Sequence, residues 1–357
     1  MEVASDLVAC QFDAGPARKA MIAIRRGDPF SEAELADLER APLPPERLPG
    51  SRWSETVTTK IIRDVGRDGN PKSPATAKGF VLDRIELPFD NPWRRNVRVT
   101  GIDFFDGGHK AAVCTFDGDI WTAELSDSES EVRWRRIGSG LHEPQSLSVV
   151  GGKIYVFDRS GIVRLQLGAG ETQVQTYESF CALPPQTAET REFAMSMVPK
   201  PGGGFYLSKG GQVAAHQGKL NGTVVEVAAD GQSYRVIATG LRQSYLGFEP
   251  KRGWLTSSDQ QGNWVPATPI HRIVEGNYYG FLQALGGSEN DHPHPIAEPL
   301  FWIPHRINSS GAIQIGVPDG ALGPLGGGLI HLSYFSRRSS SCSSTMRRSR
   351  CKAARRC

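Results

Sequence analysis

Side chains that can bind anions or exchange protons gather in two loops of the chain's second half. His216 stands in the polar stretch QVAAHQGKLNG, six residues before Gly222, and Arg242 follows a Gly-Leu turn. A histidine exchanges protons near neutral pH, and the arginine fork binds carboxylates through two parallel hydrogen bonds. An exposed loop histidine and a solvated arginine are the ordinary alternatives. The residue types alone leave both interpretations open.

A second group of polar residues follows along the chain. Asp259, Gln260, Gln261 and Gly262 form a turn that either lies on a ligand-binding face or only reverses the chain. His305 lies in the segment WIPHRINSSG, beside a predicted inner strand, where packing and turn capping are the ordinary explanation. These residues complete the set of candidates for a binding or catalytic site.

A strand-and-turn unit repeats along the middle of the chain and must position these loops. Its copies begin near Ile102, Leu147, Ala194 and Leu246, with a looser fifth near Ala312. Repeats of about 45–65 residues with a few strands each predict an all-β fold, the β-propeller. Long propeller loops gather on one face around the central channel, where ligands bind. The long loops of the third and fourth copies are therefore the predicted site.

Composition agrees with a turn-rich globular protein. The 357 residues include 40 Gly and 24 Pro, and 39% of them are hydrophobic. No stretch approaches the roughly 20 apolar residues of a membrane span. The N-terminus carries Glu2 and Asp6 and lacks the basic start and apolar core of a signal peptide. Either the protein is cytoplasmic or its true N-terminus lies elsewhere. The cysteine spacing fits neither a zinc site nor c-type haem.

Three segments are predicted along the chain. Residues 1–78 form a leader and linker with one short helix, because Ser31-Glu32-Ala33-Glu34 is a capping box. Residues 79–335 form the propeller. Residues 336–357 form a basic tail with seven Arg, one Lys and no acid, whereas the preceding 335 residues hold 33 basic and 38 acidic groups. A tail of this composition cannot bury a core, so it is predicted to be disordered.

Several segments resemble the soluble glucose/sorbosone dehydrogenase β-propellers, which use pyrroloquinoline quinone (PQQ). Two of them are GTVVEVAADGQSYRVIATGLRQSYLGFEP and SSDQQGNWVPATPIHRIVEGNYYGF. Three others are similar to the sorbosone-dehydrogenase-like branch found in large exported bacterial proteins: LPFDNPW at residues 87–93, PHRINSSG at 304–311 and GPLGGGLIHLSY at 323–334. The likeness covers residues 80–335 and is most specific in the last hundred of them.

The resemblance implies a six-bladed propeller with PQQ and calcium over the axial channel and a sugar or sugar-like alcohol as substrate. About five blades are recognisable, the last one incomplete. His216 would be the general base, and the backbone carbonyls of Gln261 and Gly262 would bind calcium. The residues implied to bind the cofactor are Arg242, Gln243, Asp259, Gln260 and His305. The family is typically exported or periplasmic, whereas this chain shows no signal peptide, so localisation stays open.

Departures from the family keep a second function open. The family's arginine turn continues with Asn-Pro, where this chain has Gln243 and Ser244. We interpret residues 336–357 as the product of a frameshift or a mis-assigned terminus rather than as a nucleic-acid arm. The last blade would then be lost, and its open edge would allow chains to associate. The alternative to a PQQ-dependent oxidoreductase is therefore a non-catalytic binding or scaffold module of a larger exported protein.

Overall fold

The computed structural model divides the chain into two units, Met1–Gly50 and Ser51–Cys357. The residues that it describes are 31–40, 55–63, 82–183, 193–211, 220–260, 267–281, 295–308 and 310–333. In the first unit, the helix α1 (Glu32–Arg40) begins at a capping box. The Ser31 backbone N–H donates to the Glu34 carboxylate (2.8 Å), and the Glu34 N–H donates to the Ser31 hydroxyl (3.3 Å). Within the described residues, no helix is long and apolar enough to cross a membrane.

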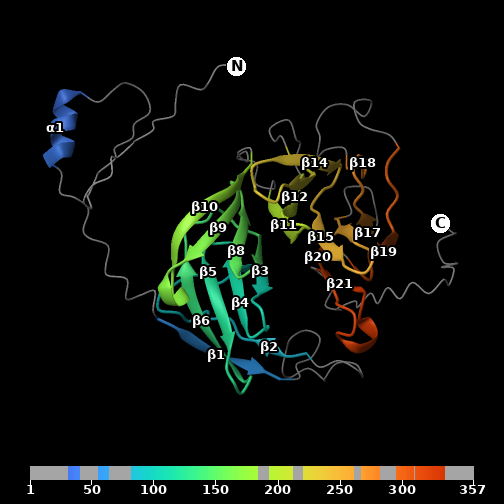
Figure 1. Ribbon diagram of the computed structural model, residues 1–357, viewed down its shortest axis with the longest axis horizontal. Helices are drawn as coiled ribbons and strands as arrows, with labels where there is room; N and C mark the ends of the chain where they lie inside the picture. The colour runs from blue at the N-terminus through green and yellow to red at the C-terminus, as the bar shows by residue number, and fades with distance from the viewer. Residues whose placement is uncertain are drawn as a thin grey trace. The chain divides into compact units, whose positions relative to one another are not determined.

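The second unit consists of β-sheets, most of whose strands are consecutive in the chain (Figure 1). The first sheet has, in order across it, β2 (Arg84–Ile85), β1 (Val57–Ile62), β6 (Glu131–Gly138), β5 (Ile120–Leu125), β4 (Lys110–Thr115) and β3 (Val99–Phe104). The second has β10 (Val174–Ala182), β9 (Gly161–Leu167), β8 (Lys153–Asp158) and β7 (Ser146–Val150). Two 3₁₀ turns, Ala169–Glu171 and Gly323–Leu325, lie in connections.

The remaining sheets continue the same pattern. The third has β11 (Ala194–Pro199), β12 (Phe205–Lys209), β13 (Val224–Val227), β14 (Tyr234–Thr239) and β18 (Asn277–Tyr278). The fourth has β15 (Tyr245–Glu249), β16 (Trp254–Ser258), β17 (Ala267–Arg272) and β19 (Phe301–Pro304). The fifth has only β20 (Gly311–Gly316) and β21 (Leu329–Ser333) among the described strands.

One edge strand of each sheet, which we call its inner strand, packs against the inner strand of the next sheet, in the order β3, β7, β11, β15 and β20. This succession of radially arranged antiparallel sheets is a β-propeller, and each sheet is one blade. The five inner strands contain or adjoin the five predicted repeat starts. The predicted β-propeller is therefore confirmed, and two strands of its fifth blade lie within the described residues.

The hydrophobic core lies between successive blades, because neighbouring blades pack face to face. Phe157 and Ile162 of the second blade form one cluster with Met197, Phe205 and other residues of the third. Strands such as β4 and β8 consequently bury nearly every residue instead of alternating between buried and exposed positions. This explains why these second strands are nearly continuous apolar runs in the sequence.

The strand β1 lies within the segment predicted as a leader. It pairs antiparallel with β6, and the Trp134 indole donates to the Thr59 hydroxyl (2.8 Å). The sequence does not predict this strand, because VTTKII is short and its partner lies about seventy residues further along the chain. The first blade thus gains an outer strand from before residue 79.

The first blade has an apolar surface on the side away from the second blade. Asp103 points toward the second blade, where its carboxylate accepts the Val149 backbone N–H (2.8 Å). Side chains alternate along a strand, so Ile102 and Phe104 point the opposite way. Both are half-exposed, Ile102 at 50% and Phe104 at 54%. No described blade covers this side of β3.

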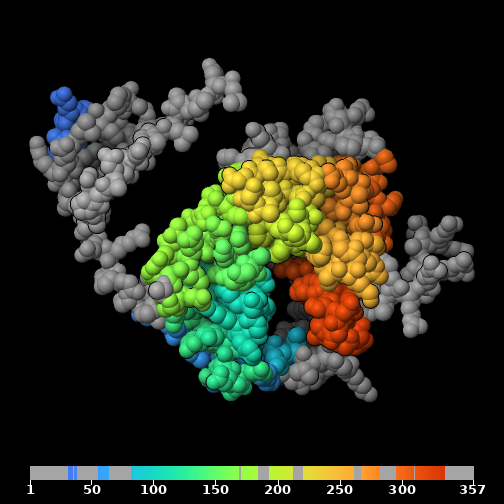
Figure 2. Space-filling model, viewed as in Figure 1, coloured from blue at the N-terminus to red at the C-terminus, as the bar shows by residue number. Residues whose placement is uncertain are grey.

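The fifth blade has a matching apolar surface. Gln314 points toward the fourth blade, where its side-chain oxygen accepts the Thr256 hydroxyl (2.6 Å). Ile313 and Ile315 point the other way and are exposed. Figure 2 shows a hollow between the teal first blade and the red fifth blade. Among the described strands, β20 and β3 are not packed together as the other inner strands are.

Candidate functional site

The second strand of each complete blade ends at a buried polar residue. Thr115 and Lys209 pair with the first residue of the inner strand, whereas Asp158 and Asp259 stand one residue after the last such pair. At this end of the blades the second strand turns into the third, and the fourth strand leads into the next blade. We call this end the loop face. The described ends of both long loops predicted from the sequence lie at this face.

Asp259 fixes the backbone of the loop that carries Arg242. Its Oδ2 atom accepts the Arg242 backbone N–H (2.7 Å). Its Oδ1 atom accepts the backbone N–H groups of Gln243 (2.7 Å) and Gln260 (2.8 Å). The carboxylate therefore ties the loop entering the fourth blade to the turn at the end of β16.

Asp158 performs the same task in the second blade. Its carboxylate accepts the backbone N–H groups of His142 (3.2 Å) and Ser160 (2.7 Å), in the loop before β7 and the turn after β8. Holding the loop face together is thus a repeated function of this position. The two positions differ in what their loops carry, because the loop held by Asp259 carries Arg242.

Arg242 is held through its guanidinium group as well as through its backbone. The Arg242 Nη1 donates to the Gln260 side-chain oxygen (2.7 Å), and the Gln260 amide nitrogen donates to the Ser310 hydroxyl (2.9 Å). The Arg242 carbonyl accepts the Gly211 backbone N–H (2.7 Å). Loops of the third, fourth and fifth blades therefore meet at this arginine, which is pre-organised for one orientation.

Burial controls the charge of the Asp259 carboxylate. Removal from water raises its pKa to about 6, while the three backbone N–H donors and the positive charge of Arg242 act in the opposite direction. Its oxygens already accept three backbone hydrogen bonds, so the carboxylate serves as a positioning group for Arg242. Among the described residues, no group of three His, Cys, Asp or Glu side chains could hold a metal ion.

The structure brings together four of the residues proposed from the sequence, namely Arg242, Gln243, Asp259 and Gln260. His305 lies exposed in the turn after β19, in the loop that also carries Ser310. The proposed base His216 and the proposed calcium ligands Gln261 and Gly262 lie outside the described residues.

A buried pair that the sequence does not indicate supports the Ser310 side of the site. The Asn308 side chain hydrogen-bonds the Nε2 atom of His331, and its oxygen accepts the Ser310 backbone N–H (3.1 Å). Burial lowers the pKa of His331 to about 4, so its ring is neutral at pH 7. Asn308 and His331 are 23 residues apart, and only the pairing of β20 with β21 brings them together.

Comparison with solved structures identifies the fold. The chain is similar to the PQQ-bound form of an aldose sugar dehydrogenase from Streptomyces coelicolor, with 14% sequence identity, a TM-score of 0.50, and coverage of 69% of this chain and 80% of that chain. It is also similar to a glucose dehydrogenase, with 14% identity, a TM-score of 0.51, and coverage of 69% and 85%. No protein-family model and no curated protein matches the chain.

These likenesses establish the class of fold. The chain shares its β-propeller fold with these dehydrogenases, as its sequence segments predicted. At a sequence identity near 14%, structural similarity establishes the fold and does not establish the reaction. Membership of the sorbosone-like branch stays a prediction.

Proposed function

We propose that the loop face binds PQQ and that the protein uses it to oxidise a sugar or sugar-like alcohol. The observation that carries this proposal is the double fixation of Arg242, through its backbone by Asp259 and through its guanidinium by Gln260. A planar, carboxylate-bearing quinone suits a pre-organised arginine fork, which offers parallel donors and a flat face. Arg242, held by Asp259 and Gln260, would bind one carboxylate of such a cofactor.

The proposed reaction removes a hydride and a proton from the alcohol. When bound, PQQ supplies the two-electron acceptor that takes the hydride from the carbon bearing the hydroxyl. The hydroxyl proton passes to a base, for which we propose His216, since imidazole exchanges protons near neutral pH. Calcium is the proposed companion ion, with the carbonyls of Gln261 and Gly262 as ligands.

Sugar-dependent dye reduction tests this function. The protein loaded with PQQ and CaCl₂ should reduce an artificial electron acceptor when aldoses are added, and omission of PQQ should abolish turnover. His216→Ala should lower kcat by about a hundredfold or more, the usual contribution of a general base, while PQQ still binds. Bound PQQ without turnover on any aldose, or full activity of His216→Ala, would contradict the proposed reaction or its base respectively.

A second candidate function is a non-catalytic binding module, and the open side of the propeller favours it. The strand β21 pairs only with β20 among the described strands, and its sequence LIHLS carries no Lys, Asp, Glu, Arg or Pro to protect an edge. We propose that two copies pair through β21 about a twofold axis. The resulting sheet β20-β21-β21′-β20′ would have four strands, like the second and fourth blades.

Light scattering coupled to size-exclusion chromatography measures this association. A concentration-dependent dimer is expected, and it should strengthen with salt because the residues after β21 carry seven Arg and one Lys. Leu332→Lys should shift the equilibrium to monomer, whereas Val274→Lys, at a similarly exposed apolar position (41% against 39%), should not. A monomer at all concentrations, or a dimer of Leu332→Lys as tight as that of the unmodified protein, would refute pairing through β21.

A further inference from the structure

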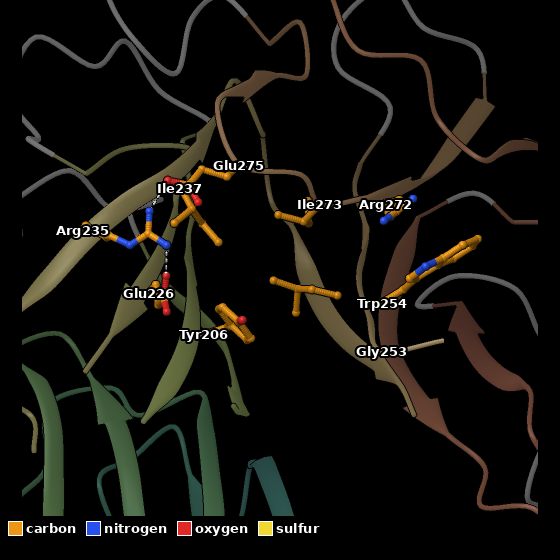
Figure 3. Close-up of a pocket in the computed structure, with 10 residues that line it drawn as sticks. Tyr206, Glu226, Arg235, Ile237, Gly253, Trp254, Arg272, Ile273 and Glu275 are labelled. Atoms are coloured by element: carbon orange, nitrogen blue, oxygen red, sulfur yellow. Dashed lines mark hydrogen bonds and ion pairs between the residues drawn. The ribbon is translucent and has the colours of Figure 1, made fainter. Parts of the chain in front are cut away.

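A cleft of about 180 Å³ lies between the third and fourth blades, at the end opposite the loop face. Its lining includes Tyr206 near the start of β12 and Trp254 at the start of β16. Figure 3 shows Glu226 and Arg235 on one side, Trp254 and Arg272 on the other, and Ile273 between them. The cleft is therefore separate from the proposed quinone site and independent of it.

The charges on the first wall neutralise one another. Arg235 pairs with both Glu226 and Glu275, and Lys200 also pairs with Glu226. The hydrogen bond from Lys200 lowers the pKa of Glu226, so this carboxylate is ionised at neutral pH. Burial raises the pKa of Tyr206, which keeps its hydroxyl protonated. This wall presents hydrogen-bond donors and acceptors with little net charge.

The second wall presents a cation that no carboxylate neutralises. The guanidinium of Arg272 lies 4.6 Å from the centroid of the Trp254 ring. Arg252 also lies over this ring, at 5.4 Å, but it pairs with Glu249 at 3.4 Å and does not line the cleft. Among the described residues, no carboxylate lies within ion-pair distance of Arg272. Stacking on an aromatic face leaves the in-plane N–H donors of an arginine available for an anion.

We propose that this cleft binds a small hydroxylated carboxylate, such as a sugar acid. Its carboxylate would pair with the Arg272 fork, the strong geometry for a planar anion. Its hydroxyl groups would exchange hydrogen bonds with Glu226 and Arg235 on the facing wall. Its C–H surface would lie on the apolar floor, which includes Leu255 and Ile273. The volume of about 180 Å³ suits one monosaccharide-sized unit.

Isothermal titration with gluconate, glucose and acetate tests the proposal on the full chain. Gluconate should bind saturably, and glucose and acetate should each bind at least about tenfold more weakly, because one lacks the carboxylate and the other the hydroxyl groups. Arg272→Ala should weaken gluconate binding by about tenfold or more, and Arg272→Lys by less. Arg252→Ala is the matched control, since it removes a cation over the same Trp254 ring outside the cleft, and it should bind gluconate as the unmodified protein does.

Three results would overturn the site. They are the absence of saturable gluconate binding at millimolar concentration, equal binding of gluconate and glucose, and an unchanged affinity of Arg272→Ala. Arg272 is exposed, so its replacement should leave the thermal unfolding midpoint close to that of Arg252→Ala. Equal midpoints would show that a lost affinity arises from the cleft and not from unfolding.

Discussion

Asp259→Ala is expected to lower the free energy of unfolding by about 3 kcal/mol and to weaken PQQ binding together with it. The substitution deprives the backbone N–H groups of Arg242, Gln243 and Gln260 of their acceptor, and each lost hydrogen bond costs about 1 kcal/mol. The loop entering the fourth blade would then no longer hold Arg242 in one position. Urea unfolding measures the first effect, and a titration with PQQ measures the second.

Asp158→Ala is the matched control at the same register position of the second blade. It removes the acceptor of two backbone N–H groups, so it should cost about 2 kcal/mol of stability. PQQ binding should be unchanged, because its loop does not carry Arg242. If both variants bind PQQ as the unmodified protein does, Asp259 has only the structural function that it shares with Asp158.

The pH dependence of the Asp259 effect follows from the direction of its pKa shift. Burial raises the pKa of the folded protein's carboxyl group to about 6, above the value near 3.8 expected on unfolding. Because the folded protein binds this proton more tightly than the unfolded chain does, protonation of Asp259 stabilises the fold fully below pH 3.8. This stabilisation is lost as the pH rises through about 6. The destabilisation measured for Asp259→Ala should therefore be larger at pH 4 than at pH 7. A pH-independent difference would show that burial does not control this carboxyl group.

Arg242→Ala is expected to weaken PQQ binding by about 2–4 kcal/mol, which corresponds to roughly thirtyfold to a thousandfold in Kd. Loss of the guanidinium leaves a cofactor carboxylate without its charged partner. Arg242→Lys should recover part of the affinity, because it restores the charge but not the planar fork. Arg164→Ala, which removes an arginine paired with Glu178 in the second blade, should bind PQQ normally. An unchanged Kd for Arg242→Ala would remove this arginine from the site.

The sequence predicted the blades well because each one is a local repeat. Every inner strand is followed shortly by a glycine-bearing turn and, except in the fifth blade, by a nearly fully buried second strand, so a pattern within about fifty residues is sufficient. It also predicted that Arg242 and Asp259 belong to one site. It did not predict how they act together, because the carboxylate contacts the arginine's backbone and the side-chain contact is made by Gln260.

Features that depend on pairing register were missed. The equivalence of Asp158 and Asp259 becomes visible only when the strands of different blades are aligned by their partners. The strand β1 and the pair of Asn308 with His331 depend on partners that are distant in the sequence. The roles of His216, Gln261 and Gly262 stay predictions, since these residues lie outside the described part of the chain.

Titration of the unmodified protein with PQQ in the presence of CaCl₂, followed by quenching of tryptophan fluorescence, measures whether the loop face binds the quinone. Saturable binding of one equivalent of PQQ is expected, with a Kd that rises by roughly thirtyfold or more in Arg242→Ala. Absence of saturable quenching up to millimolar PQQ, or equal binding by Arg242→Ala, would contradict a quinone site on the loop face.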